Sequence, residues 1–342
     1  MGSFLSKNEF PVDGRTVLIT GGSSGLGLGA ARQLAEKGAN VIIVGRNESK
    51  LQKALTHIKE GAQSLDTQRF FYSVADVTKP LECQRVVSES KLWNHGAPPD
   101  VVWCCAGSAH PSLFIDTPLD QFQTMLDSNY LSCVYMAHAT LNQWLRPASE
   151  SAQSTAGETI EKKTRDLRPR HLIFTGSFVS FYSFAGFVPY SPSKAAVRAL
   201  GDALSQEMNL YSSSSTHPAV RVHTVFPATM PTSGLDDENA VKTDLTKALE
   251  EGDQILSPEE CARRAIAGLE SGQELVPTST IIRLVMASVL GGSVRGGFWT
   301  GLVNTVLGWI TAVVMIFIRW DMDSKVAKWG REHGFSGMKK KD

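Results

Sequence analysis

The chain lacks a charge bias, a cysteine framework and an N-terminal apolar run. Its 342 residues hold 34 basic and 34 acidic side chains, so nothing in the net charge of zero favours nucleic-acid binding. Five cysteines, an odd number, suit a reducing compartment better than a disulfide scaffold. No secretory signal precedes residue 15, and no histidines or cysteines stand at metal-ligand spacing, so we expect no metal. The apolar fraction of 42% excludes wholesale disorder.

What the sequence does contain is a regular alternation of short apolar runs and helical segments. The apolar, β-rich runs lie at 15–20, 40–45, 69–74, 101–104, 171–176 and 220–226. Helical patterns fill the intervals at 26–38, 47–60, 80–95, 118–145, 189–211 and 257–271. Runs that are apolar throughout are typical of strands buried on both faces. The sequence therefore predicts a single doubly wound α/β domain over 1–280, with helices on both sides of a parallel sheet.

Two segments interrupt this alternation. Residues 147–170 are polar and carry nine charges, which predicts a mobile surface insertion. Between Arg295 and Arg319 lie 23 uncharged residues, which as a helix would be about 35 Å long, enough for a hydrocarbon core of about 30 Å. We predict a membrane-associated segment over 281–319 and a basic cytosolic tail over 320–342; a buried helix of a soluble core is the alternative.

A glycine-rich turn follows the first apolar run. Gly21, Gly25 and Gly27 form the pattern G-x-x-x-G-x-G between a strand and a helix. Such glycines allow a tight turn, close approach of a pyrophosphate and close packing of helix on strand. The N-terminus of the helix, with Ser23 and Ser24 beside it, offers hydrogen-bond donors to phosphate. A glycine-rich turn without a ligand is the alternative for this motif alone.

The end of the second apolar run predicts which nicotinamide dinucleotide is bound. An acidic residue there would bind the adenosine ribose, whereas this chain has Arg46, followed by Lys50. A guanidinium binds a phosphate in a forked geometry, so the residues favour NADPH. Asp76, after the third run, is placed to meet the adenine amino group; a helix or turn cap is the alternative.

Tyr190 and Lys194 are four residues apart at the start of a helical segment, so they share one face of that helix. An ammonium near a phenol lowers its pKa, and such a phenol can deliver a proton to a reduced carbonyl oxygen. Ser177, 13 residues before Tyr190, supplies a hydroxyl that can hold this oxygen. The sequence thus predicts ketone reduction at Ser177, Tyr190 and Lys194, although a Tyr-x-x-x-Lys pair alone is common by chance.

With these motifs together, residues 13–280 resemble the short-chain dehydrogenase/reductase family. The resemblance implies that Ser177 orients the ketone, that Tyr190 donates the proton and that Lys194 binds the nicotinamide ribose. It also implies a proton relay through Asn129 in the long preceding helix. The Asn-Asn-Ala-Gly turn of the family matches here only at Ala106-Gly107. Pairing of two copies through the helices at 118–145 and 189–211 is common in the family, and the sequence leaves this open.

Within the family, the GGSSGLG loop, the Gly-Arg-Asn after the second run and the C-terminal extension are similar to reductases of the first long-chain ketone of sphingolipid synthesis. This implies reduction of 3-ketosphinganine to sphinganine by NADPH at the endoplasmic reticulum membrane, with the catalytic domain facing the cytosol. Two alternatives stay open: a membrane-bound reductase of a steroid, retinoid or fatty acyl ketone, and a dinucleotide-sensing scaffold without catalysis.

The C-terminus bears on topology. Lys339 and Lys340 resemble a dilysine retrieval signal, which acts in the cytosol, and further basic residues follow the apolar segment. A single full crossing would place the catalytic domain in the lumen. A hairpin of two crossings would avoid this, but its first arm would have to fit between Arg283 and Arg295. Only 11 residues separate them, too few to cross the membrane as a helix. We therefore predict a re-entrant or in-plane anchor over 281–318.

Overall fold

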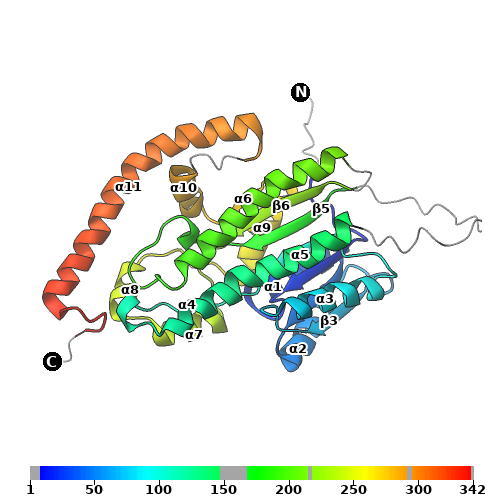
Figure 1. Ribbon diagram of the computed structural model, residues 1–342, viewed down its shortest axis with the longest axis horizontal. Coiled ribbons are helices and arrows are strands. Elements are labelled where there is room, and N and C mark those ends of the chain that lie inside the picture. The colour runs from blue at the N-terminus through cyan, green and yellow to red at the C-terminus, as the bar shows by residue number, and fades with distance from the viewer. Residues whose placement is uncertain (1–7, 147–167, 215–217, 291–294, 340–342) are drawn as a thin grey trace, which may run out of the picture.

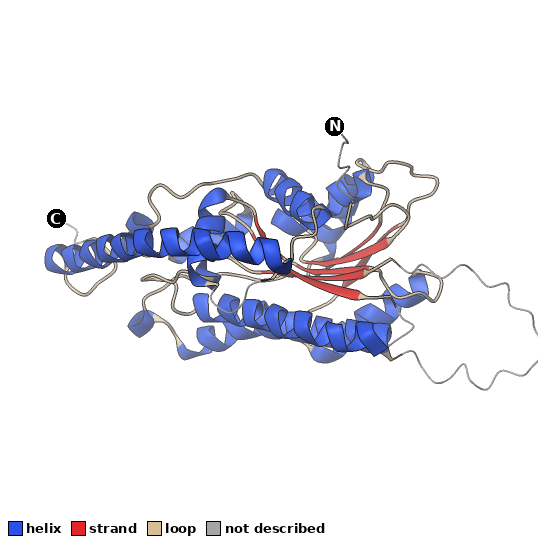
Figure 2. Ribbon diagram, turned by 90° about the horizontal axis from the view of Figure 1, so that it is seen from above, coloured by secondary structure: helices blue, strands red, loops and turns tan. Residues whose placement is uncertain are grey.

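A seven-stranded, wholly parallel sheet in the order β3-β2-β1-β4-β5-β6-β7 forms the centre of the protein (Figures 1 and 2). The computed structural model describes residues 8–146, 168–214, 218–290 and 295–339. The strands are β1 (Thr16–Thr20), β2 (Asn40–Gly45), β3 (Phe70–Val74), β4 (Val101–Cys104), β5 (Arg170–Thr175), β6 (Val220–Phe226) and β7 (Leu275–Pro277). The predicted doubly wound fold is confirmed.

Helices cover both faces of this sheet, as Figure 2 shows. They are α1 (Gly25–Glu36), α2 (Glu48–Lys59), α3 (Pro80–Trp93), α4 (Leu119–Leu126), α5 (Ser132–Leu145), α6 (Ser191–Ser214), α7 (Ser233–Val241), α8 (Asp244–Leu249), α9 (Pro258–Glu270), α10 (Thr280–Val289) and α11 (Gly297–His333). One apolar core lies between the sheet and α1, α2, α9 and α10, and a second lies between the sheet and α3, α5 and α6. The inner strands β1, β2, β4, β5 and β6 are buried on both faces, which explains their largely apolar sequences, whereas the edge strand β3 is only partly buried.

The strand order reverses between β1 and β4, and this reversal positions the site. In such a sheet, the connections on either side of the reversal diverge to opposite faces and leave a crevice at the carboxyl ends. The carboxyl end of β1 leads into the glycine loop, and that of β4 leads into Ala106-Gly107. The predicted cofactor and catalytic segments therefore meet at one edge.

Two details differ from the predicted elements. The helix predicted over 118–145 is divided into α4 and α5 by one π-helical turn, Asp127–Leu131. The seventh strand, β7, has only three residues, too few for a pattern of its own, and is recognised by its pairing with β6. The insertion predicted at 147–170 lies outside the described residues over 147–167.

The C-terminal region forms two helices that pack side by side, α10 and α11. Gly296 and Gly297 lie at the start of α11 and adopt positive φ values of 88° and 84°. At Gly308 a Cβ would lie 2.6 Å from the main-chain oxygen of Ala287, so glycine permits the close approach of the two helices. α11 continues through the predicted boundary at 319 without interruption and runs along the domain toward α8 (Figure 1).

Much of the α11 surface is apolar and exposed. Among the described residues, it is the one helix long and apolar enough to cross a membrane, judged by length and composition. Its exposed side chains include Phe298, Trp299, Trp309, Ile316, Phe317 and Trp320. Few residues of this helix are buried, which is not the pattern of a core helix.

Candidate functional site

The glycine loop presents an open cradle at the N-terminus of α1. Gly21 has φ +67°, and a Cβ there would lie 2.8 Å from the main-chain nitrogen of Ala106, so the loop needs glycine to close on β4. Gly27 packs directly on the Gly21 carbonyl oxygen. At Gly25, with φ +53°, the nearest side chain to a Cβ is Thr232 at 3.5 Å, so this glycine faces the crevice. Ser24 is the N-cap of α1 and its side chain makes no capping hydrogen bond, which leaves the first turn of the helix as a donor site.

Three further predicted cofactor residues lie beyond this loop. Arg46 is exposed after β2, and Lys50 follows in the first turn of α2, whose N-cap is Asn47. A Cβ on Gly45, next to Arg46, would lie 3.6 Å from the Ser23 hydroxyl. Ser23 and the segment that carries Arg46 therefore lie side by side at the carboxyl ends of β1 and β2.

Asp76 lies at the end of β3 and has a local role as well as the predicted one. Its Oδ1 accepts hydrogen bonds from the main-chain nitrogen of Thr78 at 3.1 Å and from its hydroxyl at 2.8 Å. Partial burial acts to raise the pKa of Asp76, but these bonds and the positive charge of Arg46 hold it below the usual value. Asp76 therefore caps the turn at Thr78 through its Oδ1 atom, as the alternative interpretation expects.

The three predicted catalytic residues come together at the ends of β5 and α6. Ser177 follows β5, Tyr190 precedes α6, and Lys194 lies in its first turn. The Ser177 side chain lies close enough to the Tyr190 hydroxyl to act on the pKa of that phenol, which it lowers. The Lys194 ammonium lies 5.7 Å from the centre of the Tyr190 ring and donates to the main-chain oxygen of Thr175 at 2.9 Å.

Asn129 lies in the π-helical turn and is fully buried. Its Oδ1 accepts from the main-chain nitrogen of Ser108 at 3.1 Å, and its Nδ2 donates to the Ser108 oxygen at 2.9 Å. A Cβ at Gly107 would lie 2.5 Å from Asn129 Oδ1 and 3.5 Å from Lys194 Nζ. Glycine at 107 therefore leaves room for both the Asn129 amide and the Lys194 ammonium beside this turn.

Ser180 is a site residue that the sequence reasoning missed. Its buried hydroxyl accepts from the main-chain nitrogen of Ser177 at 3.2 Å and donates to the main-chain oxygen of Lys194 at 3.0 Å. It therefore connects the segment after β5 to the first turn of α6. The only signal in the sequence was a serine three residues after Ser177, which is too common to be informative.

The electrostatics of Tyr190 differ from the expectation. Burial raises the pKa of Tyr190, the Ser177 hydrogen bond lowers it, and the charge of Glu238 raises it further. Lys194 does not offset this, because its ammonium is oriented toward Thr175 and burial lowers its own pKa. The predicted lowering of the phenol pKa by Lys194 is therefore wrong for the chain alone, in which the phenol is the protonated form at neutral pH.

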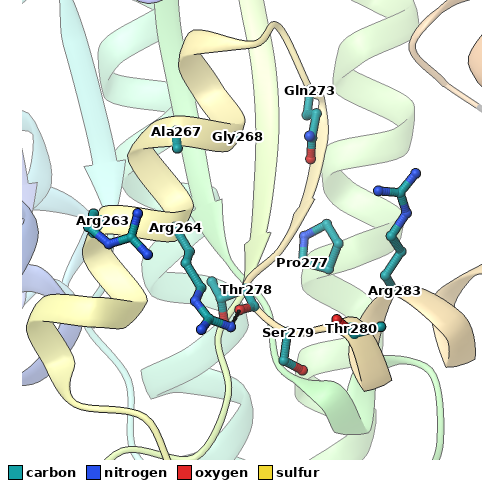
Figure 3. A pocket seen from close by; sticks show the side chains of 10 residues that line it. All are labelled: Arg263, Arg264, Ala267, Gly268, Gln273, Pro277, Thr278, Ser279, Thr280 and Arg283. Atoms are coloured by element: carbon teal, nitrogen blue, oxygen red, sulfur yellow. Dashed lines mark hydrogen bonds between the residues drawn. The ribbon is translucent and has the colours of Figure 1, made fainter.

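A separate cavity of about 340 Å³ lies at the far edge of the sheet, between α9, β7 and α10. Figure 3 shows Arg263, Arg264 and Arg283 around it. Arg263 and Arg264 pair with Glu260, and Arg264 also donates to the Thr278 oxygen at 3.0 Å. None of the predicted site residues lines this cavity. Within the described part of the chain, no group of three or more His, Cys, Asp or Glu side chains is placed to hold a metal.

Comparisons with known proteins agree with this geometry. Residues 15–158 match the family model described as short chain dehydrogenase. A 3-ketodihydrosphingosine reductase of Aspergillus fumigatus is 43% identical to this chain, with 98% of this chain and 89% of the relative covered. A 3-ketodihydrosphingosine reductase of Neurospora crassa is 40% identical, with 100% and 90% covered. The chain belongs to the short-chain dehydrogenase/reductase family.

Solved structures of this family share the fold. A short-chain dehydrogenase from Sphingobium yanoikuyae, in complex with NADPH, superposes with a TM-score of 0.61 at 18% identity, over 83% of this chain and 98% of the other. Membership of the family makes this protein an oxidoreductase that uses a nicotinamide dinucleotide. The open glycine cradle at Gly25 and the uncapped start of α1 fit the pyrophosphate of such a cofactor.

Proposed function

We propose that this protein reduces 3-ketosphinganine to sphinganine with NADPH. The observation that carries the proposal is the junction of half-buried Ser177 and Tyr190 with buried Lys194 beside the glycine cradle, in a chain at least 40% identical to two 3-ketodihydrosphingosine reductases. NADPH, when bound, supplies the hydride that reduces the carbonyl carbon. The chain's own residues hold the ketone and deliver the proton to its oxygen.

Arg46 supports NADPH rather than NADH. It is exposed at the end of β2, where its guanidinium can bind a ribose phosphate without losing an internal partner, and Lys50 adds a second positive charge. Arg46 also lies close enough to Asp76 to lower the pKa of that carboxyl, so the two residues border the same part of the crevice.

Ser177 and Tyr190 supply the acid catalysis. The Ser177 side chain acts on the pKa of the Tyr190 phenol, so the two hydroxyls are neighbours, and a ketone oxygen placed between them would be held by one and protonated by the other. Lys194, oriented by Thr175, lies on the Gly107 side where Asn129 is also held. We infer that Lys194 and Asn129 take part in replacing the proton that Tyr190 gives up.

Glu238 supports an amino ketone as the substrate. The charge of Glu238, on α7, raises the pKa of the Tyr190 phenol, so this carboxylate lies within electrostatic reach of the catalytic centre. Glu238 pairs with the Lys242 ammonium at 2.9 Å, and Glu250 pairs with the same ammonium at 2.5 Å. Two carboxylates share one ammonium, and the excess negative charge suits the amine beside the ketone of 3-ketosphinganine.

An in-plane membrane anchor supports a lipid substrate. The exposed surface of α11 is apolar and would be stabilised by contact with a bilayer. The chain that follows its C-terminal end nevertheless contacts the catalytic domain, where the Leu245 nitrogen donates to the Gly337 oxygen at 2.9 Å. A helix that crossed the membrane completely would place Gly337 on the opposite side from Leu245. We therefore infer that α11 lies in the interface of the endoplasmic reticulum membrane with the domain in the cytosol.

The decisive experiment is an assay of the purified full chain with NADPH and, separately, 3-ketosphinganine, a steroid ketone and retinal. We expect turnover of 3-ketosphinganine to exceed that of the other two. Preferential reduction of the steroid or retinal would replace the substrate proposal, and NADPH binding without turnover of any would favour the scaffold alternative.

The anchor has its own test. Alkaline carbonate washing should leave the full chain on membranes and release a chain that ends near residue 280. Release of both chains would refute the anchor without touching the catalytic proposal.

A further inference from the structure

The residues that follow α11 contact the catalytic domain close to its active site. We call residues 334–339 the C-terminal tail and residues 228–256, which contain α7 and α8, the substrate loop. The main-chain nitrogen of Leu245 donates to the Gly337 oxygen at 2.9 Å, and that of Lys339 donates to Asp244 Oδ2 at 3.1 Å. Two hydrogen bonds therefore join the tail to the first turn of α8.

Gly337 makes this contact close. A Cβ at position 337 would lie 2.8 Å from Thr243 Cβ, a separation that side chains do not tolerate without movement. Thr243 is the N-cap of α8, accepting a hydrogen bond from the main-chain nitrogen of Thr246. The tail thus rests on the residue that begins the helix.

The tail also has a defined position relative to α11. The Trp329 indole donates to the Ser336 oxygen at 3.0 Å, and the Met338 nitrogen donates to the Ser336 hydroxyl at 3.1 Å. Arg319, earlier in the same helix, donates to the Ser183 oxygen at 3.4 Å. α11 therefore holds the tail next to α8. Through Arg319, the same helix also contacts the segment that leads to Tyr190.

Two routes connect α8 with the catalytic tyrosine. Thr246 packs against Gly186, whose φ is +96°, and the Phe187 oxygen next to it accepts from the Tyr190 nitrogen at 3.1 Å. On the other side, buried Lys242 ties α7 to the end of α8 through its two ion pairs. The charge of one of those partners, Glu238, reaches the Tyr190 phenol.

We propose that the C-terminal tail is a positioning element of the active site, which holds α8 and, through α8, the walls of the substrate site next to Tyr190. The kinetic part of this proposal rests on the proposed reduction of a lipid ketone. It gives the extension beyond the α/β domain a role in catalysis in addition to membrane attachment.

Gly337→Ala in the full chain tests the proposal, because it adds one methyl group at the contact with Thr243. Gly330→Ala is the matched control, since a Cβ there meets no atom within 4 Å. We expect Gly337→Ala to speed amide exchange at Leu245 and to raise KM for 3-ketosphinganine about five- to tenfold, the value of one hydrogen bond. The NADPH dissociation constant, melting temperature and membrane retention should match those of the control.

A chain that ends at residue 334 provides a second variant, which keeps α11 and removes the contact without adding bulk. It should show the same rise in KM. If both variants match Gly330→Ala in KM and in exchange at Leu245, the proposal is overturned. If the unaltered chain does not reduce 3-ketosphinganine, the proposed substrate fails, and the proposal on the tail stands or falls on the exchange difference at Leu245.

Discussion

The Lys194 ammonium donates to the main-chain oxygen of Thr175 at 2.9 Å, so β5 rather than the phenol orients this lysine. Thr175 is itself held by β5 and receives the indole hydrogen bond of Trp103 on β4 at 3.2 Å. The lysine is therefore fastened to the rigid sheet. Tyr190, raised in pKa by burial, stays protonated at neutral pH, which is the form that a proton donor needs.

Tyr190→Phe removes this proton donor and leaves the ring. We expect kcat for ketone reduction to fall by about a hundred- to ten-thousandfold, the usual contribution of general acid catalysis. NADPH affinity, measured by fluorescence titration, should change little. Tyr135→Phe is the control and should retain normal turnover; undiminished turnover in Tyr190→Phe would refute the mechanism.

Ser180→Ala breaks the connection between the segment after β5 and the first turn of α6. The Lys194 oxygen would lose the hydroxyl donor of Ser180 and the Ser177 nitrogen its acceptor. We expect the free energy of unfolding to fall by about 1–3 kcal/mol and kcat to fall as well. Denaturant unfolding and steady-state kinetics measure the two effects. Ser212→Ala, which removes a bond to Met208 within α6, should leave kcat unchanged. Normal kcat in Ser180→Ala would exclude a positioning role.

Arg46→Asp should shift the cofactor preference from NADPH toward NADH. The substitution replaces a phosphate-binding guanidinium by a carboxylate that repels phosphate and accepts from ribose hydroxyls. We expect KM for NADPH to rise about tenfold or more while KM for NADH falls. Lys53→Asp, on the exposed surface of α2, makes the same charge change away from the crevice. An equal effect of both variants would point to general electrostatics.

Glu238→Gln should weaken binding of an amino ketone and spare an uncharged analogue. If Glu238 attracts the substrate amine, KM for 3-ketosphinganine should rise about tenfold, the value of a charge-assisted hydrogen bond. KM for the N-acylated ketone, which has no ammonium, should not change. Asp237→Asn, at the exposed neighbour, is the control. A similar rise for both substrates would show that Glu238 acts on the shape of the loop instead.

The buried pair of His171 and His223 predicts how stability depends on pH. Their rings are hydrogen-bonded, Nδ1 to Nε2, at 3.0 Å. Burial lowers the pKa of His171 to about 2 and that of His223 to about 4, from an ordinary 6.5. Both rings are thus neutral in the folded protein above pH 4, whereas the unfolded chain takes up protons below about pH 6.5.

Stability should therefore be full above pH 6.5 and fall as the pH decreases toward 4, by up to about 1.4 kcal/mol per pH unit for each histidine. Denaturant unfolding in detergent at several pH values measures this slope. His223→Gln should make it shallower, while His57→Gln, on the exposed surface of α2, should not. An unchanged slope in His223→Gln would contradict the assignment.

Local patterns were enough to predict the fold and to bring most of the candidate site residues to attention. Strands buried on both faces require uninterrupted apolar runs, and a cofactor loop at the end of β1 requires glycines where a Cβ would strike Ala106 or the Gly21 carbonyl oxygen. Tyr190 and Lys194 share a helix, so their spacing alone predicts a common face. These features depend on neighbours in the chain and are therefore visible in the sequence.

Contacts between distant segments had to come from the tertiary structure. The orientation of Lys194 toward Thr175, the bridge made by Ser180, the enclosure of Asn129 by Ser108 and the return of Gly337 to α8 all join segments whose sequences carry no sign of each other. The same holds for the pKa of Tyr190, because burial depends on everything packed around the phenol. The sequence by itself determined which groups are present and on which elements they lie; only the packing of those elements decided which groups meet and how acidic they are.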